Sequence, residues 1–195
     1  MALAPPLAFR ARSAAVAGTD DAPRTDISAL ESFFKDELRK YISTSISEDV
    51  DILNRQIAES DGDPLLRNRL GVLYARYGLF SEAETQFIDV IRKKEHFPTL
   101  INLGNIKFLS QKFEEAREYY QRAAVLVPEH PSVLLALARV NHELENYGNS
   151  RSAYENLKQV NPALARKYSY LELSVNSGSR AASGMSVYSD LIWEE

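Results

Sequence analysis

Apolar residues recur along this chain at the three- and four-residue spacing of buried helix faces, and a longer period lies over that spacing. Each period holds a Leu followed by a small residue, then a second small residue, then an aromatic residue. The copies are Leu70-Gly71, Ala83 and Phe87; Leu103-Gly104, Ala116 and Tyr120; and Leu137-Ala138, Ser150 and Tyr154. The copies stand 33 and 34 residues apart, so the pattern predicts three successive helix pairs between Pro64 and Pro162.

This pattern resembles the tetratricopeptide repeat (TPR), whose signature places Leu-Gly, Tyr, Ala, Phe and Pro at fixed positions within about 34 residues. The resemblance covers residues 64–162, about half of the chain. It implies an all-α fold, in which antiparallel helix pairs stack into a right-handed α-α superhelix, a TPR solenoid. The repeats are predicted at residues 64–96, 97–130 and 131–164.

The small residues of the pattern are expected to set how closely two helices pack. A larger side chain in place of Gly71 would force the pair apart, at a cost of about 1–3 kcal/mol. Gly78 is predicted to end the first helix of its repeat in the left-handed conformation. Gln111 and Glu145 stand at the equivalent positions, and in the third repeat Asn146 is expected to supply the left-handed residue through a one-residue shift.

The segments on either side of the repeats are predicted to cap them, because a solenoid needs covered ends. Residues 26–62 are interpreted as an N-terminal helical pair, a cap or a degenerate repeat, with Asp26 as the first N-cap. A capping box of Ser45 and Glu48 is expected to begin the second helix. The first helix carries apolar residues at the spacing of one buried face: Ile27, Leu30, Phe33, Phe34, Leu38 and Tyr41. Residues 165–176 are predicted to form a C-terminal capping helix.

The two ends of the chain have their own character. Residues 1–25 are predicted to be a disordered or extended leader, with an Arg-bearing transit peptide or a start inside a longer protein as alternatives. Residues 177–195 are predicted to be a flexible tail with an apolar end, Leu191, Ile192 and Trp193. An exposed apolar end lowers solubility, so we expect these residues either to pack back on the domain or to dock on another molecule.

Composition narrows the chemistry. The 195 residues carry a net charge of −4, so broad attraction to nucleic acid or to anionic membranes is not expected. The chain has no Cys, which excludes disulfides and thiolate chemistry, and no apolar run approaches the roughly 20 residues that span a bilayer. His96, His130 and His142 lie in separate repeats without metal-ligand spacing. We therefore expect no catalytic, cofactor or metal site; the sequence does not distinguish cytoplasm from periplasm.

The resemblance implies a binding surface instead. Members of the family bind peptides or partner proteins on a concave face lined mainly by the first helix of each repeat. The corresponding positions form the predicted partner-binding groove: Asn68, Val72, Arg76, Ile101, Asn102, Asn105, Phe108, Leu135, Arg139 and His142. The amides are expected to bind a peptide backbone, and Arg76 and Arg139 to pair with acidic residues of the ligand.

Members that bind chaperone tails hold a terminal carboxylate with a set of Lys, Asn and Arg residues. The matching positions here are Asn68, Val72, Asn102, Ser132 and Ala136. Only Asn102 agrees, so recognition of that acidic motif is not expected. The leading hypothesis is a non-catalytic scaffold that binds a protein or peptide. The alternatives are a self-assembling homo-oligomer, in which the apolar tail docks on a neighbouring protomer, and the targeting segment of a larger enzyme.

Overall fold

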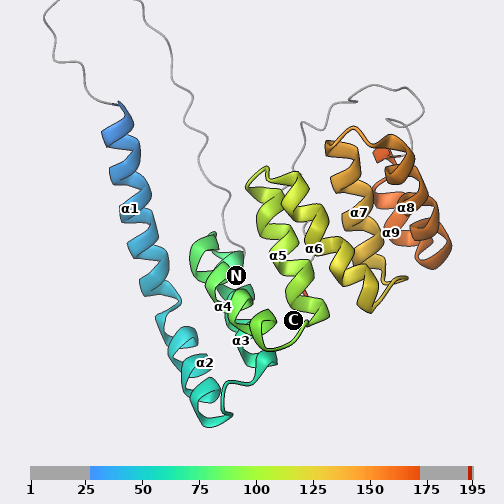
Figure 1. The fold of residues 1–195 in the computed structure, drawn as a ribbon. Coiled ribbons are helices and arrows are strands. Elements are labelled where there is room, and N and C mark those ends of the chain that lie inside the picture. Colours follow the sequence, from blue (N-terminus) through green and yellow to red (C-terminus); the bar gives the residue numbers. More distant parts are fainter. Residues whose placement is uncertain (1–26, 172–192, 195) are drawn as a thin grey trace, which may run out of the picture. The chain divides into compact units, whose positions relative to one another are not determined.

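The computed structural model describes residues 27–171 and 193–194 (Figure 1). These residues form α-helices joined by short turns, with no strand among them, which confirms the expected all-α class. The helices of this described part are α1 (Ile27–Ser45), α2 (Ser47–Glu59), α3 (Pro64–Arg76), α4 (Phe80–Lys93), α5 (Phe97–Leu109), α6 (Phe113–Leu126), α7 (Pro131–Glu143), α8 (Tyr147–Val160) and α9 (Pro162–Lys167). The chain divides after Leu38 into two units, and the repeats lie wholly in the second.

The hydrophobic core of the second unit is shared between successive helix pairs. The pairs α3–α4, α5–α6 and α7–α8 each pack internally, and each also packs on the next helix along the chain. Three clusters of buried side chains result, with Val72, Phe87 and Leu103 in the first, Leu100, Tyr120 and Val133 in the second, and Leu135, Tyr154 and Leu171 in the third. Because each pair completes its core with the following one, the repeats form a TPR solenoid of antiparallel helix pairs.

Glycine on the first helix of a pair makes room for an aromatic ring from the second. A Cβ added at Gly71 would lie 2.3 Å from Cε1 of Phe87, and one at Gly104 would lie 2.3 Å from Cε1 of Tyr120. Both rings are at most 1% exposed, so they have nowhere to move. The predicted packing role of the small residues is confirmed, and the structure supplies its cause, which is a ring seated directly on the glycine.

The turn inside each pair uses one residue in the left-handed conformation. Gly78 has φ of 75°, while Gln111 and Glu145 have φ of 58°. The expectation that Asn146 would take this role in the third repeat is wrong, since its φ is −85°. The N–H of Asn146 donates to the carbonyl of Asn141 at 2.8 Å, and this closure of the turn leaves Glu145 as the left-handed residue.

Relieving the strain at Glu145 is expected to stabilise the protein. A residue with a Cβ destabilises the folded state by about 1–2 kcal/mol in this conformation, and glycine avoids this cost. Glycine also gives the unfolded chain more conformational entropy, which offsets about 0.4–1 kcal/mol of the gain in stability. Glu145→Gly should therefore raise the free energy of unfolding by up to about 1 kcal/mol in urea titrations followed by circular dichroism. Glu145→Ala, which keeps a Cβ, is the matched control and should show no gain. A destabilising Glu145→Gly would contradict this account.

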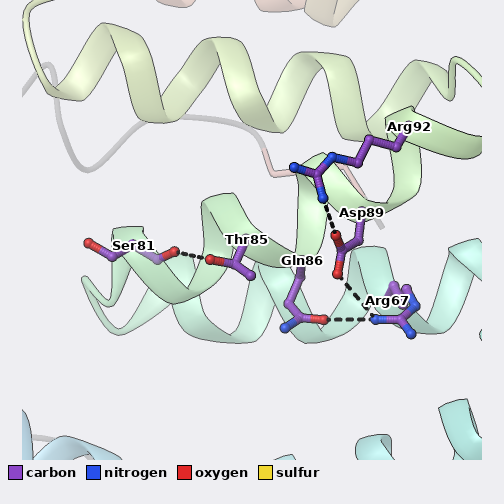
Figure 2. A network of polar contacts seen from close by, with 6 residues as sticks. All are labelled: Arg67, Ser81, Thr85, Gln86, Asp89 and Arg92. Atoms are coloured by element: carbon purple, nitrogen blue, oxygen red, sulfur yellow. Dashed lines mark hydrogen bonds and ion pairs between the residues drawn. The ribbon is translucent and has the colours of Figure 1, made fainter.

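Polar contacts connect the outer faces of the helices. Asp89 of α4 lies 3.7 Å from Arg67 of α3 and 3.4 Å from Arg92, as Figure 2 shows. Lys107 occupies the position where the repeat pattern has Tyr, and its Nζ lies 2.7 Å from Glu84 and 3.2 Å from Glu115. Desolvation lowers the pKa of Lys107, but the hydrogen bonds and charges of the two carboxylates outweigh it, so the pKa is raised. Lys107 thereby links α5 to both α4 and α6.

The N-terminal helices differ from their prediction. The expected capping box is absent, because Ser45 is still part of α1 and its Oγ donates to the carbonyl of Tyr41 at 2.8 Å. The helix α2 follows Ile46 without a side-chain cap, and Asp26 lies outside the described residues. The expected buried face of α1 does not form at Phe33, Phe34, Leu38 and Tyr41, whose exposed fractions are 57–72%. The helix α2 does pack on α3, with Ile57 buried.

The C-terminal cap is interrupted by a turn within the described residues. The helix α9 begins at Pro162 and ends at Lys167, nine residues before the predicted end, and the side chain of Asn161 caps it by accepting from the N–H of Leu164. Tyr168 and Leu171 follow and are buried with Ala165 against α7 and α8. Residues 168–169 form a turn, and residues 170–171 are again helical. The leader 1–25 and residues 172–176 lie outside the described residues.

Candidate functional site

The first helices of the three repeats lie next to one another, since α5 contacts both α3 and α7. They carry the ten predicted groove residues, and only Arg76 among these is exposed. The segment Trp193–Glu194 lies against α3 and α5, where Glu194 contacts Asn68 and Asn102. The contacts of this segment show which of the predicted groove residues lie around a common site.

The backbone of Glu194 is held by two asparagine side chains. The Nδ2 groups of Asn68 and Asn102 donate to the carbonyl of Glu194 at 2.8 and 2.7 Å. The N–H of Glu194 in turn donates to Oδ1 of Asn102 at 2.9 Å. Asn102 therefore contacts one residue with both its amide nitrogen and its amide oxygen. These two contacts involve only the backbone of Glu194 and not its side chain.

A chain of hydrogen bonds fixes the orientation of these amides. Oδ1 of Asn68 accepts from the hydroxyl of Thr99 at 2.9 Å and from Nδ2 of Asn102 at 3.1 Å, which directs the Asn68 amide nitrogen toward Glu194. The hydroxyl of Thr99 lies 2.8 Å from Nδ1 of His96. Because the Thr99 proton goes to Asn68, Nδ1 of His96 is the donor in this contact. Burial lowers the pKa of His96, against an opposing effect of the Asp63 carboxylate, and so favours the neutral ring.

The side chain of Glu194 reaches the third repeat. Its Oε1 accepts from the hydroxyl of Ser132 at 2.5 Å. Ser132 lies in the first turn of α7, where the positive end of the helix dipole favours a carboxylate. We call Asn68, Asn102 and Ser132 together the Glu194 site. It takes one residue from each of α3, α5 and α7.

The residue before Glu194 contacts apolar side chains. Trp193 is partly buried against the cluster that α3, α4 and α5 form, which contains Val72, Leu103 and Ile106. Leu191 and Ile192, the other two residues of the predicted docking tail, lie outside the described residues. The described part of the tail thus presents an aromatic ring to the first repeats and a carboxylate to the third.

Five of the other predicted groove residues line a small cavity that also includes Ser132. Its volume is about 20 Å³, room for about one water molecule, and it is lined by Ile101, Asn105, Phe108, Tyr120, Ser132, Leu135, Ala136 and Arg139. Oδ1 of Asn105 accepts from the hydroxyl of Tyr120 at 2.9 Å. The guanidinium of Arg139 lies 5.1 Å from the ring centre of Phe108 and 5.7 Å from that of Tyr168. Arg139 was expected to pair with a ligand carboxylate, and the structure places it between two rings.

Two predicted groove residues lie apart from the others. Arg76 lines a hollow of about 400 Å³ between α2 and α3 together with Asp49, Ile52, Leu53, Gln56, Arg69 and Leu73. His142 is buried with its ring edge-on to Tyr147 and Tyr170. In the part of the chain that the structure describes, no three His, Asp or Glu residues are placed to hold a metal ion. None of its helices has the length and apolar character needed to cross a membrane.

Comparison with known proteins agrees with this architecture. Residues 97–130, the α5–α6 pair, match the family model of the tetratricopeptide repeat. The chain is 28% identical over 98 residues to human Cell division cycle protein 16 homolog and 27% identical over 94 residues to mouse Tetratricopeptide repeat protein 8. The α5–α6 pair is therefore a tetratricopeptide repeat by sequence as well as by fold. The match covers 45% of this chain against the first relative and 48% against the second, but only 16% and 18% of those relatives.

A third relative is matched over more of its own length. The chain is 27% identical over 123 residues to "Uncharacterized protein ycf37" of Cyanophora paradoxa, and the match covers 60% of this chain and 70% of that protein. The matched length exceeds the repeats alone, which span residues 64–164.

The predicted groove lacks two residues that the structure places at the Glu194 site. Thr99 orients Asn68, and Ser132 binds the Glu194 carboxylate. A signal for Ser132 existed, because it stands at a position that the family uses for carboxylate binding. Thr99 carried no such signal, since its role depends on an asparagine 31 residues earlier in the chain.

Proposed function

We propose that this TPR protein is a non-catalytic interaction module that binds an extended segment of a partner protein on the face formed by α3, α5 and α7. The observation that supports this is the pairing of Asn68 and Asn102 with the backbone of Glu194. Side-chain amides that pair with a backbone accept any extended segment that presents a carbonyl and an N–H at this spacing. The net charge of −4 favours a protein ligand over a nucleic acid.

Asn102→Asp is expected to weaken partner binding at least tenfold. The substitution keeps the size of the side chain but removes the donor to the ligand carbonyl and adds a negative charge beside it. Proteins captured by the wild-type chain and lost with Asn102→Asp would be identified by mass spectrometry, and the binding segment titrated by calorimetry. Asn156→Asp, at an exposed position on α8, makes the same chemical change away from the site. A partner segment that binds wild type and Asn102→Asp equally would exclude this face.

The same contacts support a second candidate, a self-assembling unit. The segment that fills the Glu194 site belongs to this chain, so a second copy offers an identical segment to the same site. In that arrangement the protein forms a homo-oligomer that weakens on dilution. The experiment below separates the two arrangements.

A further inference from the structure

The geometry points to Trp193–Glu194 as an intramolecular ligand of the Glu194 site, which a partner segment displaces. We infer that the site takes an extended segment in which an aromatic residue directly precedes an acidic one. This inference rests on the proposed function and names the ligand of the same surface. It follows from three features of the contacts.

The first feature is that the backbone clamp fixes the register of the bound segment. One residue, Glu194, donates its N–H to Asn102 and accepts at its carbonyl from the Nδ2 groups of Asn102 and Asn68. Oδ1 of Asn68 accepts from Thr99 and from Asn102, and these contacts within the site orient the donors before a ligand arrives. Whatever residue occupies the clamped position, its side chain and that of the preceding residue point to fixed surroundings.

The second feature is that these surroundings differ in chemistry. The preceding side chain lies on the apolar cluster that includes Val72 and Leu103, which suits a large aromatic ring. The clamped side chain reaches the hydroxyl of Ser132 at the start of α7, which suits a carboxylate. A basic residue there would meet the positive end of the α7 dipole. The site therefore selects aromatic–acidic order.

The third feature is that the occupant is tethered to the protein. Residues 172–192 connect Leu171 to Trp193 and reach about 70 Å when fully extended, enough to bring the segment to the site of its own chain. A tethered ligand acts at an effective concentration of up to millimolar, so a free partner must exceed that competition to bind. Occupation by the chain's own segment thus sets a threshold for partner binding.

The emission of Trp193 reports directly on this contact, because the chain has a single Trp. In the full-length chain we expect the emission at shorter wavelength than that of the free tail peptide, and Asn102→Asp to move it to the wavelength of the peptide. Ser132→Ala should move it part of the way, and Asn156→Asp not at all. Circular dichroism of each variant checks that the helices remain. If folded Asn102→Asp and Ser132→Ala both keep the wild-type emission, the inference is wrong.

Displacement is tested with a synthetic peptide of residues 186–195 carrying Trp193→Phe, so that only the protein emits under Trp-selective excitation. Adding it to the wild-type chain should shift the emission of Trp193 to longer wavelength in a saturable way. The same peptide with Glu194→Lys should be about tenfold weaker, and this difference should shrink on the Ser132→Ala protein. Emission that Asn102→Asp changes but no peptide shifts would show a fixed structural segment, and would overturn displacement.

Dilution distinguishes a bound segment that belongs to the same chain from one that belongs to a second copy. Emission of wild type that does not change with protein concentration, together with the mass of a monomer by light scattering, supports the intramolecular arrangement. A dimer that Trp193→Ala abolishes would overturn it in favour of self-assembly. Failure of the peptide to bind, while a captured partner still depends on Asn102, would contradict the aromatic–acidic ligand and leave the proposed function standing.

Discussion

Replacing Gly104 with Val is expected to lower the free energy of unfolding by about 3 kcal/mol. Even a single added carbon would lie 2.3 Å from the ring of Tyr120, which is 1% exposed and hydrogen-bonded through its hydroxyl to Asn105. The ring cannot retreat without losing that bond, so α5 and α6 must separate. Urea unfolding followed by circular dichroism measures the loss.

Gly148→Ala is the matched control for Gly104→Val. Gly148 also lies in a helix, α8, but a Cβ there meets nothing within 4 Å. Its replacement should leave stability unchanged or raise it by up to about 1 kcal/mol through helix propensity. Combining Gly104→Val with Tyr120→Leu should cost less than the sum of the two changes, because the smaller side chain no longer collides. Near-wild-type stability of Gly104→Val would refute the role assigned to this glycine.

Arg139→Ala is expected to destabilise the protein by about 2–3 kcal/mol. The side chain is 5% exposed, and its guanidinium lies over the rings of Phe108 and Tyr168, which belong to the second repeat and the C-terminal cap. Its loss removes both cation–π contacts and the packing of its stem between them. Arg139→Lys should recover only part of the stability, since an ammonium group does not stack on two rings.

Arg76→Ala serves as the comparison for Arg139→Ala. The two arginines stand at predicted groove positions, but Arg76 is exposed, so its replacement should change the free energy of unfolding by at most about 0.5 kcal/mol. Thermal and urea unfolding of both variants provide the measurement. If Arg139→Ala keeps wild-type stability, Arg139 does not hold the second repeat to the cap. The prediction that Arg139 binds an acidic ligand residue would then be favoured again.

Several features of the fold could be predicted because they depend on neighbours within one repeat. The period of Leu70, Gly71 and Phe87 gives the helix pairs, and Gly78 gives the turn. These contacts recur at fixed separations along the chain, so the residue types at those positions are enough to predict the helix pairs and the turn. The turn at Glu145 was misjudged because the hydrogen bonds of the turn, and not the identity of Asn146, decide which residue is left-handed.

The groove was predicted as a set of positions, and the structure divides that set. Asn68 and Asn102 act together on Glu194, whereas Arg139 is used inside the core and Arg76 lies at another hollow. The division could not be predicted because a polar residue on a first helix has the same sequence signature whether it meets a ligand, a neighbouring ring or water. The exposed Phe33 and Phe34 of α1 show the same difficulty for apolar residues.

The sequence by itself determined the repeat, its length and the small residues that let rings pack on helices, because these are short-range consequences of side-chain size and backbone freedom. Only the tertiary structure decided which residues on the face formed by α3, α5 and α7 contact the same segment. It brings Asn68, Asn102 and Ser132, from three different helices, onto a segment between 62 and 126 residues away in the chain. Contacts at such separations arise only once the core has placed the helices side by side, and no local pattern encodes them.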